Sequence, residues 1–109
     1  MIKIAVSASR KYNVIMDRGA LGRAGELFAD AGISGGRKKL CIVTDRNVAP
    51  LYGTEDGELW RSLTDAGFEL YRFVFEGGEK TKTLDTLADI LNFLADNRFT
   101  RSDMLVALG

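Results

Sequence analysis

The sequence contains no histidine, which removes the commonest general base and the commonest metal ligand from consideration. Its single cysteine, Cys41, excludes an internal disulfide and cannot by itself build a zinc site. Acid–base chemistry would therefore fall to aspartate, glutamate, lysine or tyrosine. The chain is more simply interpreted as a binding unit than as a self-sufficient active site, and its cysteine usage favours the reducing cytoplasm.

Net charge and long apolar runs are also missing. The 15 basic and 15 acidic residues balance to zero, so nothing in the composition favours nucleic acid or an anionic membrane as a partner. No apolar run is long enough to cross a bilayer, and the first residues do not resemble a secretory signal. What remains is an ordinary globular composition, with 46% hydrophobic residues and enough length, 109 residues, for one domain with its own core.

The apolar residues repeat with strand and helix periods in alternation. Residues 3–8 and 12–16 predict an antiparallel hairpin at a sheet edge, and a helix follows from 19 to 31, where Gly32 is placed to end it. Further strands are expected at 40–43, 68–75 and 104–108, and further helices at 58–66 and from 84 onward. The last helix has Thr83 as its expected N-cap. Its amphipathic stripe consists of Leu84, Leu87, Ala88, Leu91, Leu94 and Ala95.

This order of elements predicts an α/β fold, with a Rossmann-like parallel sheet flanked by helices and the N-terminal hairpin at its edge. Residues 1–109 are expected to form one domain. Because the sequence stops one residue after an apolar strand, at Gly109, we expect it to be a piece of a longer protein.

Several residues have simpler local interpretations. The glycines at 19, 22 and 25 do not match the dinucleotide-binding pattern G-x-G-x-x-G, so we interpret them as turn and close-packing glycines. Cys41 is expected to be a small buried apolar residue. The basic run at 37–39 is most simply a solvated loop.

Two polar segments follow strands whose carboxyl ends should share one edge, where open α/β sheets bind ligands. The first is "TDRN", in which Asp45 can accept hydrogen bonds from a ribose diol and Asn47 can donate and accept. The second is "EGGEKTK", residues 76–82, at the start of a helix. A third segment at this edge would follow Gly109.

The second segment combines backbone freedom with charges of both signs. Gly77 and Gly78 would let a ligand approach the backbone, while Lys80 and Lys82 suit a phosphate at a helix N-terminus. Glu79 could accept from a ribose or pair with Lys82. These features resemble a nucleotide site split over adjacent strands. The alternative is that Asp45 and Asn47 only form a turn and that the second segment is a solvated connector with a helix cap.

Four segments together resemble the 3-dehydroquinate synthase family, in order along nearly the whole chain. "VTDRNVAPLY", residues 43–52, and "RSDMLVALG", residues 101–109, are the most specific. "GGEKTKTLDTL", residues 77–87, is similar to the family's loop and helix after the second parallel strand. "YNVIMDRGALGRAGELF" is similar to an early family segment, although Asp17 and Arg18 stand where glycine-containing pairs are usual.

The resemblance implies the N-terminal, NAD-binding part of an enzyme that converts 3-deoxy-D-arabino-heptulosonate 7-phosphate to 3-dehydroquinate and phosphate in the shikimate pathway. In the family's scheme NAD transiently oxidises a ring hydroxyl, phosphate is eliminated, and an aldol step closes the ring after re-reduction. A divalent metal, zinc or cobalt, assists. The parent would be a cytoplasmic homodimer that binds NAD and the sugar-phosphate substrate.

Residue by residue, the resemblance implies that Asp45 and Asn47 face the adenosine ribose. Glu79 and Lys82 would contact the same end of the cofactor, and the backbone from Gly77 through Gly78 and Lys80 to Thr81 would form the loop around it. The family's pyrophosphate loop, metal ligands and substrate-binding residues have no counterpart in this sequence. We therefore expect the 109-residue chain to be inactive alone and to bind NAD weakly or not at all.

Two other hypotheses stay open. Related sugar-phosphate cyclases, such as 2-deoxy-scyllo-inosose synthase, and metal-dependent polyol dehydrogenases share this type of NAD domain. A protein of another class, a free-standing flavodoxin-like binding domain, would show the same order of helices and strands.

Overall fold

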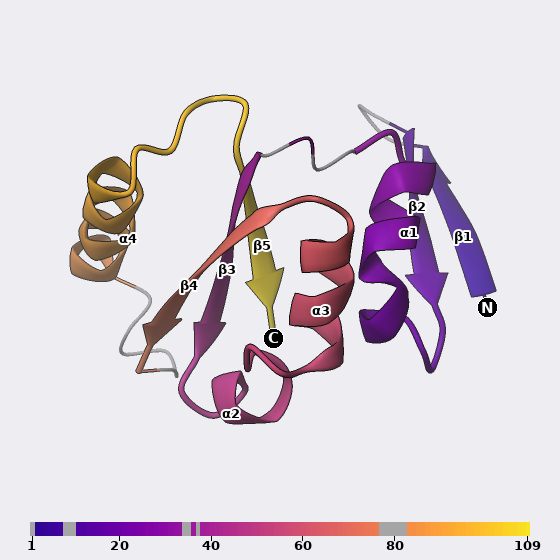
Figure 1. Ribbon diagram of the computed structural model, residues 1–109, viewed down its shortest axis with the longest axis horizontal. Coiled ribbons are helices and arrows are strands. Elements are labelled where there is room, and N and C mark those ends of the chain that lie inside the picture. The colour runs from indigo at the N-terminus through magenta and orange to yellow at the C-terminus, as the bar shows by residue number, and fades with distance from the viewer. Residues whose placement is uncertain (1, 8–10, 34–35, 37, 77–82) are drawn as a thin grey trace.

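The computed structural model describes residues 2–7, 11–33, 36, 38–76 and 83–109. The α/β prediction is confirmed: a three-stranded parallel sheet is flanked by helices, and the N-terminal hairpin forms a second, antiparallel sheet (Figure 1). Strand β1 (Ile2–Ser7) pairs with β2 (Lys11–Met16). This hairpin is a two-stranded sheet of its own, separated from the parallel sheet by helices in the view of Figure 1, and it does not extend the parallel sheet by hydrogen bonding.

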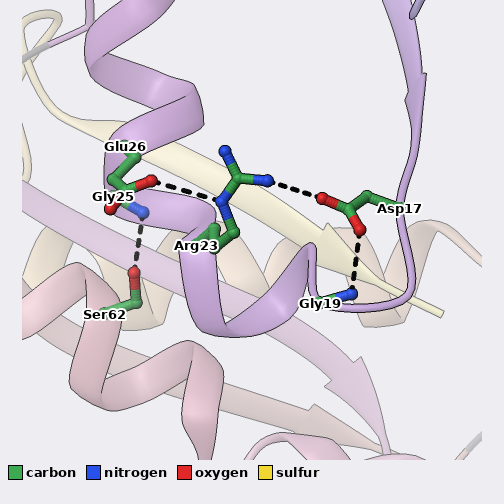
Figure 2. A network of polar contacts seen from close by, with 6 residues as sticks. All are labelled: Asp17, Gly19, Arg23, Gly25, Glu26 and Ser62. Atoms are coloured by element: carbon green, nitrogen blue, oxygen red, sulfur yellow. Dashed lines mark hydrogen bonds and ion pairs between the residues drawn. The ribbon is translucent and has the colours of Figure 1, made fainter. Parts of the chain in front are cut away.

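The first helical segment begins later than the sequence pattern suggests. A 3₁₀ turn, η1 (Leu21–Arg23), leads into α1 (Ala24–Asp30). Residues before it are held in a turn by Asp17, whose carboxylate accepts from the Gly19 N–H at 3.2 Å and pairs with Arg23 at 2.6 Å (Figure 2). Gly32 ends the segment in the left-handed conformation, with φ at 82°, as predicted.

Helix α1 packs against α3 (Glu58–Asp65) through a glycine. The Gly25 N–H donates to Ser62 Oγ at 2.9 Å (Figure 2). A Cβ at position 25 would lie 2.7 Å from the Ser62 carbonyl oxygen, so only glycine fits without a shift of the backbone. The interpretation of Gly25 as a close-packing glycine is therefore correct. On α3, Leu59 and Leu63 point into the core, as the pattern indicated.

The parallel sheet has β3 (Lys39–Asp45) at its centre, between β4 (Glu69–Phe75) and β5 (Met104–Leu108). Because β3 is covered on both faces, its apolar run is continuous rather than alternating. The main core lies between this sheet and the helices α1 and α3. It consists of Ala24, Leu40, Ile42, Leu59, Leu63 and Phe68.

Two further helices, α2 and α4, follow strands of the parallel sheet. Helix α2 (Ala49–Tyr52) directly follows the loop after β3, and it was not predicted because four residues are too few to show a helical period. Helix α4 (Leu84–Asp96) begins at the expected N-cap, where Thr83 Oγ1 accepts from the Thr86 N–H at 3.3 Å.

Most of the leucine stripe of helix α4 is exposed, and only its last leucine, Leu94, is half-buried. Leu84, Leu87 and Leu91 are 83%, 50% and 56% exposed. The sheet is met instead by Phe93, whose ring lies edge-on to that of Phe73 with 5.5 Å between centroids. A sequence period identifies an apolar face, but here the aromatic ring on the other side of the helix makes the contact.

Lys39 is not part of a solvated loop, which corrects the prediction for that residue. It begins β3, and its Nζ donates to the carbonyl oxygens of Asn97 at 2.5 Å and Arg98 at 3.3 Å. The ammonium also lies 5.9 Å from the ring centroids of Tyr71 and Phe99. A cation beside the last carbonyls of α4 is favourable, so Lys39 fastens the end of that helix to the amino end of the sheet.

Candidate functional site

The carboxyl ends of the three parallel strands lie side by side at one edge of the sheet (Figure 1). Asp45 is in register with Phe75 on β4, and Thr44 is in register with Leu108 on β5. The pairing continues one residue past β3, because the Arg46 N–H donates to the Phe75 carbonyl at 2.9 Å. The two strand ends on which the sequence prediction depends are thus adjacent.

Asp45 shapes the loop that leaves β3. Its Oδ1 accepts from the backbone N–H groups of Asn47 at 2.9 Å and Val48 at 2.8 Å. This arrangement is the turn-forming role that the sequence left open as an alternative. Within the described residues Oδ2 has no hydrogen-bond partner, so it can accept a bond from a ligand while Oδ1 holds the turn. Asn47 is exposed beside it.

Thr44 joins the ends of β3 and β5, a contact that the sequence analysis did not predict. Its side chain is 1% exposed, and its hydroxyl donates to the Leu108 carbonyl oxygen at 2.8 Å. A polar residue at the end of a continuous apolar run was the signal in the sequence. The bond fixes the spacing between the last residues of two neighbouring strands at this edge.

An ion pair joins the ends of β3 and β4 and was likewise not predicted. The Arg46 guanidinium lies 3.4 Å from Glu76 Oε2, and the two side chains are 66% and 72% exposed. Such a pair adds little to stability because water and salt screen it. It does set the local charge: together with Asp45, these side chains carry one net negative charge at neutral pH.

The remaining predicted residues, Gly77, Gly78, Glu79, Lys80, Thr81 and Lys82, lie outside the described residues. The structure places the residue on each side of that segment, Glu76 at the carboxyl end of β4 and Thr83 at the start of α4. Contacts of the segment with a nucleotide therefore stay a prediction.

Four other features of the described part of the chain were considered: a reactive thiol, a metal site, a membrane-spanning helix and a second cleft. Burial raises the pKa of the Cys41 thiol to about 11, so this thiol is not a nucleophile at neutral pH. No three His, Cys, Asp or Glu side chains among the described residues are grouped to hold a metal ion. None of the described helices is long and apolar enough to span a bilayer. A cleft between α1 and α3 has no lining residue from the carboxyl edge.

The strand order β4-β3-β5 identifies the class of fold. It matches the first part of the flavodoxin-like order 2-1-3, in which the crossover from the first strand to the second and the crossover from the second to the third run in opposite directions along the sheet. Ligands of such doubly wound sheets bind beyond the carboxyl ends of the strands. The protein is therefore a Rossmann-like α/β unit whose expected ligand edge carries Thr44, Asp45, Arg46 and Asn47.

Comparison with known proteins identifies the relatives. The chain is 35% identical over 98 residues to 3-dehydroquinate synthase of Clostridium acetobutylicum, a match that covers 90% of the chain and 26% of that enzyme. It is 38% identical over 98 residues to the Streptococcus pneumoniae enzyme, with the same coverage, and 34% identical over 109 residues to that of Streptococcus mutans. The last match covers 99% of this chain and 29% of the enzyme. No protein-family model matches the chain.

The resemblance seen in the motifs is thus confirmed, and the chain is a relative of the 3-dehydroquinate synthases. It spans about a quarter of the length of the curated relatives that it matches. The activity, substrates and partners of the full-length relatives are therefore only proposed for this chain.

Proposed function

We propose that the chain is a nucleotide-binding part of a 3-dehydroquinate synthase and supplies the adenosine end of an NAD site. The similarity to these enzymes over at least 90% of the chain carries the proposal. The adjacency of the β3 and β4 ends supports it, because a site split over two loops requires those loops to start side by side. The parent would act on a sugar phosphate as a lyase in the cytoplasm.

The residues at the edge have chemistry that fits the ribose of such a cofactor. Asp45 Oδ2 is an acceptor for a ribose hydroxyl, and its orientation is fixed because Oδ1 is held by two backbone N–H groups. Asn47, which is exposed two residues later, has a side-chain amide that can both donate and accept hydrogen bonds. NAD supplies transient oxidation of a hydroxyl when it is bound. The described residues offer no group of ligands for the metal that the parent is expected to use, so the proposal for this chain concerns the nucleotide alone.

The test adds NAD and the sugar-phosphate substrate to the 109-residue chain and follows NAD binding by ligand-observed NMR and phosphate by a colorimetric assay. The sequence left open weak NAD binding or none. Because Asp45 is held in place at the end of β3, we expect weak, millimolar NAD binding, and because only part of the site is present we expect no release of phosphate. Turnover would contradict the assignment of this chain as a binding part only. Absence of any NAD signal at millimolar concentrations would contradict the nucleotide site itself.

A further inference from the structure

The carboxyl edge carries two side chains of opposite charge that are adjacent in sequence. Asp45 offers a carboxylate oxygen, and Arg46 offers a guanidinium 66% exposed to solvent. In Rossmann-type sites a carboxylate suits a ribose with a free 2′-hydroxyl, whereas a nearby arginine accommodates a 2′-phosphate. The edge therefore holds a potential group for each kind of dinucleotide, NAD and NADP.

Glu76 forms an ion pair with this arginine. Its Oε2 lies 3.4 Å from the Arg46 guanidinium, across the junction between β4 and β3. The junction is held by the backbone bond from the Arg46 N–H to the Phe75 carbonyl, which brings residues 46 and 76 to the same position along the edge. A guanidinium paired with a carboxylate has fewer donors and less net charge to offer a phosphate.

We propose that Glu76, by pairing with Arg46, biases this edge toward a nucleotide with a free 2′-hydroxyl and against one with a 2′-phosphate. With Glu76 in place, the three charged side chains at positions 45, 46 and 76 sum to one negative charge, which repels a phosphate dianion. Without Glu76 the sum is zero and the guanidinium is available. The inference rests on the proposed nucleotide site and assigns its discrimination to one ion pair.

The experiment compares the affinities of NAD and NADP for the 109-residue chain and for Glu76→Gln, by NMR titration at low salt. Glu76→Gln keeps the size of the side chain and removes its charge. We expect the ratio of NADP affinity to NAD affinity to rise about two- to fivefold, the range for an exposed charge pair. The effect should shrink at high salt, since the groups are exposed.

Two further variants distinguish an effect of the Arg46–Glu76 ion pair from an effect of any change in net charge. Glu69→Gln removes the same charge from the opposite end of the same strand, β4, and should leave the affinity ratio unchanged. Arg46→Gln should lower the affinity for NADP in the Glu76→Gln background, because the group that would meet the 2′-phosphate is gone. A ratio that changes equally in Glu69→Gln and Glu76→Gln would overturn the inference.

The outcomes distinguish this inference from the proposed function. If the chain binds NAD but Glu76→Gln leaves the ratio unchanged, the discrimination lies elsewhere and the nucleotide site stands. If the chain binds neither dinucleotide, the proposed function is contradicted and the inference falls with it.

Discussion

Asp103 fastens the start of β5 at the end of the sheet opposite to the site. Its Oδ1 accepts from the Lys39 N–H at 2.9 Å, and its Oδ2 accepts from the backbone N–H of Thr100 at 2.8 Å and from the Thr100 hydroxyl. The bonds from the backbone of Thr100 and of Lys39 lower the pKa of this carboxyl. In the unfolded chain an aspartate titrates near its ordinary value of about 3.9.

Because the pKa of Asp103 is lower in the folded chain, its contribution to stability is present above about pH 4 and is lost as pH falls through the folded value. We predict that Asp103→Asn lowers the free energy of unfolding by about 1–3 kcal/mol at pH 7, since an amide cannot accept on both sides. The difference from wild type should narrow below pH 4. Urea unfolding across this pH range measures it.

Asp89→Asn is the control for Asp103→Asn, because Asp89 is an exposed residue of α4. It should change stability by no more than about 0.5 kcal/mol at any pH. A loss that is as large in Asp89→Asn as in Asp103→Asn, or a difference that does not depend on pH, would show that the hydrogen bonds of Asp103 do not act as described.

At this scale the sequence predicted which polar residues follow the strands better than it predicted their contacts. Asp45 was identified from its place after a strand, and its turn-forming bonds follow from the same place. Lys39 was misassigned because its partners, the carbonyls of Asn97 and Arg98, are almost sixty residues away. Glu76 pairs with Arg46 only because β3 and β4 are neighbours, which residue type does not reveal.

At the scale of the elements, the contact between α1 and α3 depends on a missing side chain. A Cβ at Gly25 would lie 2.7 Å from the Ser62 carbonyl oxygen and 2.9 Å from the Ala66 Cβ. We predict that Gly25→Ala forces the two helices apart and lowers the free energy of unfolding by about 1–3 kcal/mol, the usual cost of overpacking. Thermal or denaturant unfolding followed by circular dichroism provides the measurement.

Gly22→Ala is the matched control, three residues earlier and facing the same helix. Its Cβ would lie 3.7 Å from the nearest atom, in the Glu58 side chain, which is an ordinary contact. That variant should be neutral or slightly more stable, because alanine restricts the unfolded chain. Equal destabilisation by both variants would mean that loss of glycine, and not the close approach of the helices, is responsible.

The sequence predicted the elements well where a period extends over several residues. Strand β5 and the start of α4 were placed correctly, as was the end of α3 near Gly67, whose φ is 97°. Helix α2 was missed for lack of length. The face that α4 presents to the sheet could not be derived from its leucines, because the Phe93–Phe73 ring contact depends on how the helix is placed against β4.

At the scale of the whole molecule, the fold brings to one edge three segments that are widely separated in sequence. The alternation of helices and strands predicted a parallel sheet, but the order β4-β3-β5 comes from the structure. This order is what places Asp45 between Phe75 and the end of β5. That the ligand is NAD is a proposal that depends further on the similarity to the 3-dehydroquinate synthases, since the side chains at this edge alone suit several nucleotides.

Titration of the ¹⁵N-labelled chain with NAD, followed in amide spectra, tests most directly whether this edge binds the nucleotide. The account predicts that the largest changes in amide chemical shift fall on Arg46, Asn47, Val48 and Glu76. The amide shifts of Lys39 and Asp103, at the opposite end of the sheet, should not change. The variant Asp45→Asn should bind NAD more weakly. Shifts concentrated in the cleft between α1 and α3 or at the amino ends of the strands, with Asp45→Asn binding as wild type does, would contradict it.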